Sequence, residues 1–204
     1  MRNIFFFQAI ILAAGTSSRM GQPKQLLMLD HSCLLDHTIE AVHGCGIPRP
    51  ILVLGAFKDK IMEQAKLADS CEIVINEDYV SGQASSLKHG VSNISCKCDA
   101  VIFLLCDQPM VRSHLLCQMM DEFIKTTPDI LYPTYQNQRG NPVIISNRLF
   151  PRLMEAKGDK GARFLFADAG LNINAYPVND PAVVMDIDTP EDYELILGKQ
   201  NRKQ

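Results

Sequence analysis

The sequence predicts an α/β fold in which helices cover both faces of a mainly parallel central sheet. Apolar runs of four to eight residues alternate with segments of helical periodicity along the chain, an order typical of parallel strands joined by helices. The run AVIFLL, Ala100–Leu105, has no polar alternation and is expected to be a strand buried on both faces. A length of 204 residues suits one well-buried domain, and we expect a single domain over 1–204.

The elements follow in order from the N-terminus. In the first half of the chain we expect strands over Phe6–Leu12, Ile51–Leu54 and Glu72–Ile75, and helices over Ser32–His43, Lys58–Ala68 and Ala84–Val91. In the second half the central strand is followed by a helix over Ser113–Ile124, with Ser113 as its cap, and by strands around Ile130–Tyr132 and Val143–Ile145. The polar stretch Thr134–Asn141 is expected to form a turn or hairpin loop.

The net charge and the cysteine spacing argue against several classes of protein. A net charge of −3 argues against a nucleic-acid-binding surface. The seven cysteines contain no CxxC pair, and Cys96-Lys97-Cys98 is a poor zinc knuckle, so we expect free thiols in a reducing cytoplasm. The apolar start of the chain resembles a short signal peptide, but only Arg2 precedes it and Gln8 interrupts it. We expect it to be a strand, and no other segment approaches the length needed to span a bilayer.

The loop after the first strand, residues 13–24, is small, polar and basic. Its first residues, Ala-Ala-Gly, allow a phosphate or a flat base to approach the backbone closely, and successive N–H groups can form an anion-binding concavity. Arg19 and Lys24 supply donors suited to phosphate oxygens. The alternative is a flexible turn with two solvated cations. Parallel sheets bind ligands beyond the carboxyl ends of their strands, so this position favours a triphosphate site.

A carboxylate follows the apolar central strand, in Cys106-Asp107-Gln108-Pro109. Asp107 is expected to project from the end of a rigid strand over the same edge of the sheet, which suits Mg²⁺ bound by one or two carboxylates, phosphates and water. A turn or helix cap is the alternative. Near the C-terminus, Asp186 and Asp188 are expected to alternate on a strand end, so that only one faces the crevice. Thr189 and Asp192 are expected to cap the helix that follows.

Three further motifs have two readings each. Ser81-Gly-Gln-Ala-Ser-Ser-Leu87 opens a helix after a strand, so it either contacts a base or sugar or serves as a plain cap. Arg139-Gly-Asn-Pro142 and Gly158-Asp-Lys-Gly-Ala-Arg163 combine glycine with cations. They either hold a second, anionic substrate or form ordinary turns.

Together the segments LAAGTSSRMGQPK, GQASSL, CDQP, RGNPV, GDKGAR and DIDTPEDY resemble, in this order, the molybdenum cofactor cytidylyltransferases, which are part of the MobA-like nucleotidyltransferases. The resemblance extends from about residue 9 to 195. It implies a single Rossmann-like, three-layer domain that transfers a nucleotidyl group to a phosphorylated pterin. Ala14 favours cytosine, because the guanylyl branch usually has glycine there. The chain departs from the family pattern at Cys106, commonly glycine, and at Asn141, often histidine, and the second departure bears on the acceptor.

The resemblance also implies roles for individual residues. The nucleotide is expected to contact Leu12, Ala13, Ala14, Gly15, Arg19, Lys24, Gly82, Ser85, Ser86, Asp107 and Gln108. Mg²⁺, or alternatively Mn²⁺, is expected on Asp107 and on Asp188 rather than Asp186, with Arg19, Lys24 and Asp107 as the catalytic residues. A second substrate is expected at Arg139, Gly140, Asn141 and Arg163.

The implied reaction transfers CMP from CTP to molybdenum-molybdopterin, and a molybdenum hydroxylase is a possible recipient of the product. The alternatives are guanylyl transfer from GTP, a sugar-phosphate acceptor, or a non-catalytic carrier of the molybdenum cofactor. Neither nucleic acid nor a membrane is an expected partner.

Overall fold

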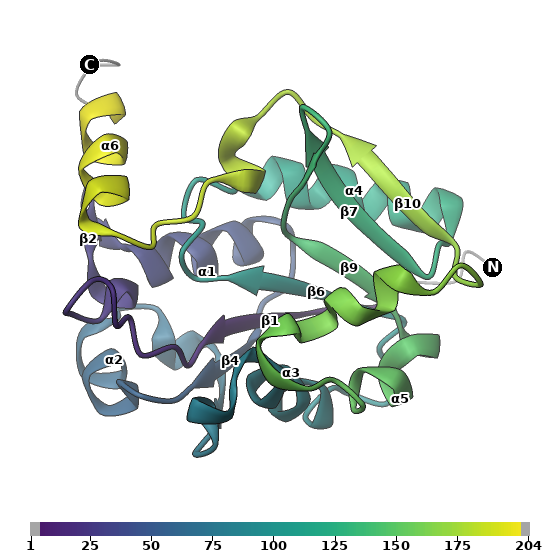
Figure 1. Ribbon diagram of the computed structural model, residues 1–204, viewed down its shortest axis with the longest axis horizontal. Coiled ribbons are helices and arrows are strands. Elements are labelled where there is room, and N and C mark those ends of the chain that lie inside the picture. The colour runs from purple at the N-terminus through teal and green to yellow at the C-terminus, as the bar shows by residue number, and fades with distance from the viewer. Residues whose placement is uncertain (1–4, 201–204) are drawn as a thin grey trace.

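An eight-stranded, mainly parallel sheet forms the centre of the computed structural model, which describes residues 5–200 (Figure 1). Residues 1–4 and 201–204, the ends of the predicted single domain, lie outside the described residues. Helices cover both faces of the sheet, and the prediction of a Rossmann-like α/β fold with three layers is confirmed. No helix among the described residues is long and apolar enough to cross a membrane.

The strands lie in an order that differs from their order along the chain. Across the sheet they are β10 (Ile173–Pro177), β7 (Ile130–Tyr135), β9 (Val143–Ser146), β6 (Ala100–Leu105), β1 (Phe7–Ala13), β4 (Ile51–Leu54) and β5 (Glu72–Ile75), and the short β8 (Gln138–Arg139) pairs with β7. The pairs that β1 makes with β4 and β6 are parallel, whereas β9 is antiparallel to both its neighbours. The parallel half therefore presents the carboxyl ends of β1, β4, β5 and β6 at one edge.

Alternating side chains divide the core between the two faces of the sheet. On β1, Ala9 and Ile11 pack against one face and Ile10 against the other, as expected of a strand buried on both sides. The first face is covered by α1 (Leu34–Gly44), α2 (Lys58–Gln64) and α4 (Ser113–Thr126). The second is covered by α3 (Gln83–Ser92), α5 (Phe150–Leu153) and the kinked 3₁₀ helix η5 (Gly158–Ala167).

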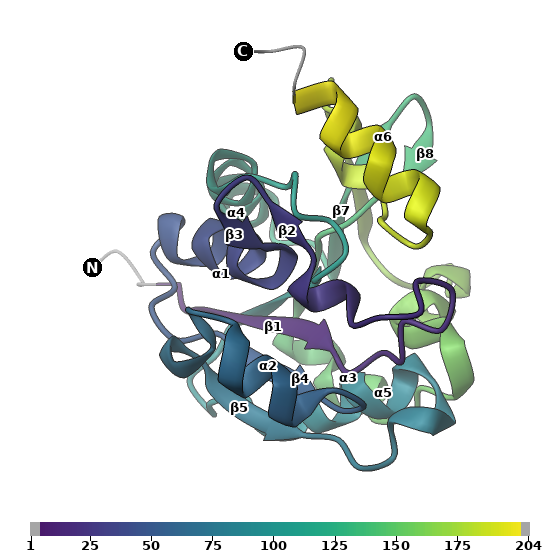
Figure 2. The same ribbon diagram turned by 90° about the vertical axis from the view of Figure 1, so that its left-hand side faces the viewer.

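The C-terminal helix α6 (Pro190–Gln200) stands at the end of the molecule toward which the arrowheads of β1 and β6 point (Figure 1). In Figure 2 the loop after β1 passes beneath this helix. Met20 of that loop and Ile187, which precedes α6, share an apolar cluster with Ile196 of α6 and Leu29. Leu29 lies in β2 (Met28–Leu29), which forms a small hairpin with β3 (Ser32–Cys33). This cluster fixes the C-terminal segment against the loop that was predicted to bind phosphate.

Several local predictions are wrong. Ser113 starts α4 without capping it, because Arg112 takes the N-cap position and no side chain caps the helix. The first helix begins at Leu34 because Ser32 and Cys33 pair with the preceding strand, and α2 stops at Gln64. Asp186 and Asp188 do not lie on a strand end: they follow a 3₁₀ helix, η6 (Pro181–Val184), in irregular backbone.

Other local predictions hold. The polar stretch after β7 forms a hairpin with β8, turning through Gln136 and Asn137, which both have positive φ angles. Asp192 Oδ2 accepts hydrogen bonds from the backbone N–H groups of Asp188 and Thr189 and from the Thr189 hydroxyl, so the predicted cap of α6 is present.

Candidate active site

A cavity of about 450 Å³ opens beyond the carboxyl ends of β1 and β6. This is within the size range of sites for small ligands. Its wall contains many of the residues predicted to meet the nucleotide, namely Leu12, Ala14, Gly15, Lys24, Gly82, Ser86 and Asp107, together with Thr16, Gln25, Tyr79, Val80, Gln83, Leu105, Cys106 and Asp159. We call it the nucleotide cavity.

The loop after β1 is folded around a buried glutamine that the sequence analysis did not single out. Gln25 is 1% exposed, and its Nε2 donates to the carbonyl oxygens of Ala13 (2.9 Å) and Gly15 (3.2 Å). Ser17 donates its hydroxyl to Gln25 Oε1 and accepts the backbone N–H of Lys24, which brings the two ends of the loop together. These hydrogen bonds fix the conformation of the loop, so that Gly15 and Thr16 face the cavity.

At one end of the cavity a single ammonium group joins two carboxylates from distant parts of the chain. Lys24 Nζ lies 2.6 Å from Asp107 Oδ2 and 2.8 Å from Asp188 Oδ1. The side chains of Lys24 and Asp107 are only 14% and 15% exposed. Arg19, outside the cavity wall and 65% exposed, contacts the other oxygen of Asp188 at 3.0 Å. The structure therefore gathers the predicted pair of cations and the predicted pair of carboxylates in one cluster.

The charges in this cluster stabilise one another. Burial alone would lower the pKa of Lys24, but the charge of Asp107 and the hydrogen bonds to Asp107 and Asp188 raise it above its usual value. Burial disfavours ionisation of Asp188, yet Lys24 and Arg19 hold the pKa of that carboxyl below its usual value. Burial and the charge of Asp107 raise the pKa of Cys106 to about 12, so the thiol that departs from the family pattern stays neutral beside the cluster.

Asp107 keeps one oxygen free. Among the side chains that the structure describes, Asp107 Oδ1 is the buried polar atom without a hydrogen-bond partner. Such an atom is uncommon in native proteins and indicates a missing cation or donor. No group of three or more His, Cys, Asp or Glu side chains suited to a metal occurs within the described residues, so a metal here would have two carboxylates at most. That donor set fits Mg²⁺ or Mn²⁺ completed by phosphate and water oxygens.

The opposite end of the cavity is formed by the start of α3. Gly82 has a φ of 104° and leaves no room for a side chain, because Asp159 and the Gly158 backbone lie against it. Of the two predicted serines, Ser86 lines the cavity but Ser85 does not, and the Asn76 amide donates to both hydroxyls. Asp159 accepts the backbone N–H of Gln83 and places a carboxylate at this end of the cavity wall.

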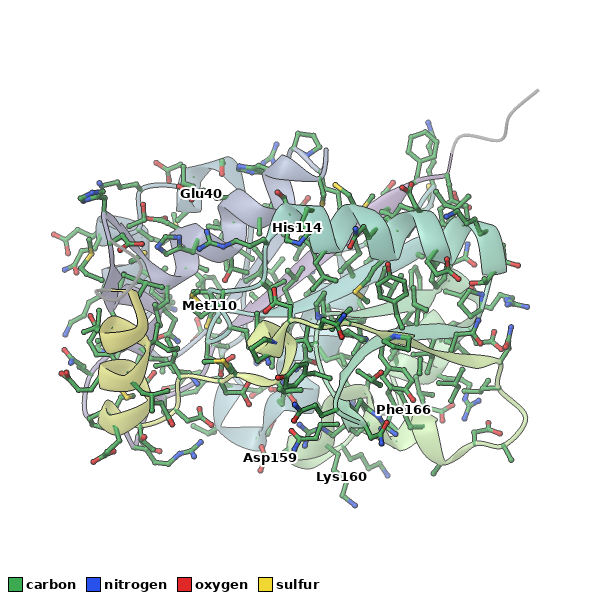
Figure 3. The ribbon with its side chains drawn as sticks, turned by 90° about the horizontal axis from the view of Figure 1, so that it is seen from above. Glu40, Met110, His114, Asp159, Lys160 and Phe166 are labelled. Atoms are coloured by element: carbon green, nitrogen blue, oxygen red, sulfur yellow. The ribbon has the colours of Figure 1, made fainter. Side chains whose placement is uncertain are left out.

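A second, smaller cavity of about 100 Å³ adjoins the first, and Leu12, Gln83 and Leu105 line both. The four residues predicted to bind a second substrate, Arg139, Gly140, Asn141 and Arg163, all line it. Lys160 and Phe166 complete its polar and aromatic wall, and Figure 3 shows both on the same side of the molecule as Asp159. We call it the acceptor cavity.

Arg139 is held in the acceptor cavity by aromatic rings rather than by an acid. Its guanidinium carbon lies 3.8 Å from the ring centre of Phe166 and 5.1 Å from that of Tyr132. The two rings meet edge to face. Stacking of this kind orients the guanidinium while leaving its N–H groups available to an anion.

Four residues predicted to meet the nucleotide do not line the nucleotide cavity, namely Ala13, Arg19, Ser85 and Gln108. Gln108 was expected to meet the nucleotide, but it is buried and does not line the nucleotide cavity. Its amide instead binds Asp186, whereas Asp188 shares Lys24 with Asp107. Asp186 and Asp188 therefore have different partners, Gln108 and Lys24.

Comparisons with known proteins match this geometry. A family model described as the MobA-like NTP transferase domain matches residues 9–174. The chain is 26% identical over 197 residues to the purine catabolism protein PucB of Bacillus subtilis (strain 168), covering 92% of this chain and 94% of that protein. It is 29% identical over 187 residues to the molybdenum cofactor cytidylyltransferase of Escherichia coli (strain K12), covering 90% and 92%. The crystal structure of Rv0371c from Mycobacterium tuberculosis H37Rv in complex with manganese is similar with a TM-score of 0.81 and 26% identity, covering 94% of this chain and 98% of that one.

Proposed function

The chain belongs to the MobA-like NTP transferase family, and from this premise we propose that it transfers CMP from CTP to the terminal phosphate of molybdenum-molybdopterin. An oxygen of that phosphate forms a bond to the α-phosphorus of CTP. The bond from this phosphorus to the bridging oxygen of the β-phosphate breaks, and pyrophosphate leaves. The observation that carries the proposal is the cluster in which Lys24 joins Asp107 and Asp188, with a free buried oxygen on Asp107.

The charges of the nucleotide cavity support one orientation of CTP. The triphosphate is placed at the end with Lys24, the nearby Arg19 and the backbone N–H groups of residues 14–16, because Lys24 is the cation among the described residues that line this cavity. The ribose and base then lie toward Gly82 and Ser86, where Asp159 would repel phosphate. The carboxyl oxygens of Asp107 and Asp188 are the proposed ligands of a divalent cation, which would supply charge neutralisation at the phosphates.

The residues of the chain then act mainly by position and charge. The attacking phosphate is already an anion, so no general base is required. Lys24 and Arg19 are proposed to move from the carboxylates to the phosphate oxygens and to stabilise the departing pyrophosphate. Leu12, Gln83 and Leu105 line both cavities, so donor and acceptor are proposed to meet along this shared wall.

The acceptor cavity supports an anionic second substrate, because Arg139, Lys160 and Arg163 lie around it. At about 100 Å³ it is too small to enclose a pterin, so it is proposed to grip the acceptor's phosphate while the rest of the molecule lies outside. Asn141, where the family often has histidine, stands in its wall and is neutral at every pH.

Other acceptors and bases are the nearest alternatives. The similarity to PucB covers as much of the chain as the similarity to the cytidylyltransferase, so the matched length does not decide between acceptors. GTP as donor and a sugar phosphate as acceptor are further versions of the same chemistry. A non-catalytic carrier is disfavoured, because it would not need two carboxylates and two cations at the nucleotide cavity.

The cellular setting forms part of the proposal. All seven cysteines are free, which supports a reducing cytoplasm. A molybdenum hydroxylase is the proposed recipient of the product.

The test is a transfer assay with radiolabelled CTP or GTP, molybdenum-molybdopterin and Mg²⁺. We expect label from CTP to appear on the pterin with release of one pyrophosphate per transfer, and at least tenfold less product with GTP. A preference for GTP would overturn the choice of base. Pyrophosphate release only with a different phosphorylated acceptor would overturn the choice of acceptor. The absence of both transfer and heat of CTP–Mg²⁺ binding would favour the carrier.

A further inference from the structure

The segment that carries Asp188 has little regular structure of its own. Residues 185–189 lie between η6 and α6 in irregular backbone, yet Asp188 must stay beside Asp107 if both are to bind one cation. Hydrogen bonds to other parts of the chain therefore decide where its carboxylate lies. We call residues 183–188 the carboxylate segment.

One side chain outside the nucleotide cavity holds this segment. Gln108 is 4% exposed, and its Nε2 donates to Asp186 Oδ1 at 2.6 Å and to the Val183 carbonyl at 3.3 Å. Gln108 follows Asp107 directly, at the end of β6. The amide thus ties the segment carrying Asp188 to the strand end carrying Asp107.

The backbone makes the same connection. The Ile187 N–H donates to the Asp107 carbonyl at 2.9 Å, and Ile187 is fully buried. Asp186 and Asp188 lie directly before and after Ile187. The bond from Gln108 to Asp186 therefore restricts the position from which Asp188 can contact Lys24. Without the bond from Gln108, Asp186 would be free to compete with Asp188 for Lys24 and Arg19.

The bond has the properties of a strong positioning contact. It joins the buried amide of Gln108 to the carboxylate of Asp186, an exposed residue, and charge-assisted bonds of this length are stronger than neutral ones. A buried amide without a partner is also costly, so Gln108 strongly favours the arrangement in which it is satisfied.

We propose that Gln108 is a positioning residue that, through Asp186, holds the carboxylate segment so that Asp188 and Asp107 bind one divalent cation. The inference rests on the proposed function in taking these two aspartates as the metal ligands. It assigns to Gln108 and Asp186 a task that neither performs by touching the nucleotide.

The same segment also contacts the acceptor cavity. The Val183 carbonyl accepts the Asn141 N–H at 2.9 Å, and a Cβ at position 140 would overlap that carbonyl oxygen. Displacing the segment would therefore disturb the acceptor cavity as well as the cation site.

The test exchanges the two partners of the bond. Gln108→Glu places a carboxylate against Asp186. The double variant Gln108→Glu/Asp186→Asn restores the shorter of the two Gln108 bonds, as an amide–carboxylate bond in the opposite direction at the net charge of the wild type, but not the longer bond to the Val183 carbonyl. Binding of Mn²⁺ without nucleotide is followed by electron paramagnetic resonance of the free ion. We expect Gln108→Glu to bind Mn²⁺ at least tenfold more weakly, and the double variant to return to within threefold of the wild type.

The sign of the effect separates positioning from simple charge. An added carboxylate near the cluster would by charge alone tighten Mn²⁺ binding, so binding by Gln108→Glu that equals or exceeds the wild type overturns the proposal. A folded double variant that stays as weak as Gln108→Glu overturns it too. If Gln108→Glu fails to fold, as judged by its melting curve, Gln108→Met is used, and it must bind Mn²⁺ at least threefold more weakly than the wild type.

Failure of the proposed function would look different. Wild-type protein that binds Mn²⁺ without transferring CMP overturns that function alone, because the variants are judged by Mn²⁺ affinity. Wild-type transfer of CMP with unchanged Mn²⁺ affinity in the Gln108 variants overturns the positioning role alone.

Discussion

The two cavities are neighbours but are built in different ways. At the nucleotide cavity, Lys24 binds both Asp107 and Asp188, and the side chains of Lys24 and Asp107 are largely buried. In the acceptor cavity, Arg139 is exposed and is held by two aromatic rings, with no acid paired to it in the described residues. The first arrangement resists change, because removing one charge leaves the others unpaired in a poorly solvated place. The second tolerates change, because the cost of altering an exposed cation is small.

This difference indicates a division of labour. The triphosphate and a divalent cation are common to every nucleotidyl transfer, so a fixed cluster suits them. Acceptors differ between relatives, and a small, exposed cavity can be adapted to a new acceptor by few substitutions. The predictions below measure this contrast, from the largest effect to the smallest.

Loss of Asp107 would affect the common chemistry most. Asp107→Asn keeps the size of the side chain but removes a proposed metal ligand, so we expect turnover to fall about 10³-fold, measured as pyrophosphate release at saturating CTP and Mg²⁺. Asp168→Asn is the matched control, since Asp168 pairs with Arg152 outside both cavities. A melting temperature close to that of the wild type would show that the fold survives. Near-normal release by Asp107→Asn would remove the basis for a metal at this cluster.

Loss of Lys24 comes next and has a second consequence. For Lys24→Met we expect kcat/KM for CTP to fall about 100-fold, since the phosphates lose a charge-assisted donor. Asp107 would also lose its cation, whereas Asp188 keeps Arg19. Leaving the buried carboxylate of Asp107 unpaired costs about 3 kcal/mol and lowers Tm by about 10 °C in a domain of this size.

Mn²⁺ should restore much of that lost stability, because it binds the folded protein and replaces the missing positive charge. Differential scanning fluorimetry with and without Mn²⁺ measures this. Lys58→Met is the control, because Lys58 forms an exposed pair with Glu77 away from the cavity wall. An equal Mn²⁺-dependent rise in Tm for the wild type and Lys24→Met would contradict the shared-cation arrangement.

Arg139 tests the acceptor side alone. Arg139→Gln is expected to raise KM for the acceptor about tenfold while KM for CTP stays within twofold, because the residue lines only the acceptor cavity. Initial rates at varied concentrations of each substrate provide both values. Arg148→Gln, which removes an arginine paired with Asp129, is the control. Equal increases in both KM values would show that the two cavities do not act separately.

The smallest effect is expected from the ring that orients Arg139. Phe166→Leu keeps an apolar side chain but removes the stacking surface, so the guanidinium gains freedom and KM for the acceptor rises about threefold. In the variant Phe166→Leu/Arg139→Gln the loss should not exceed that of Arg139→Gln, because Phe166 acts through the arginine. Full additivity of the two effects would assign Phe166 a separate contact with the acceptor.

Much of the fold and part of the site could be predicted from the sequence, because those features depend on short stretches of chain. The apolar run Ala100–Leu105 predicted a strand buried on both faces of the sheet. The small residues that follow β1 predicted a loop at the carboxyl end of that strand. The cap of α6 by Thr189 and Asp192 is likewise local. Strand β10 and the helices η5 and α5 were not predicted, because their apolar residues show no clear period until the sheet edge covers them.

Only the tertiary structure decided which residues meet. The backbone spacing of Asp186 and Asp188 on an assumed strand could not say which one would reach Lys24. Gln25 looked like an ordinary polar residue, and Gln108 was predicted to contact the nucleotide rather than Asp186. A residue's type and neighbours along the chain determine its local conformation. Contacts across 83 or 164 positions, such as those of Lys24 with Asp107 and Asp188, depend on how the whole sheet brings its strand ends together.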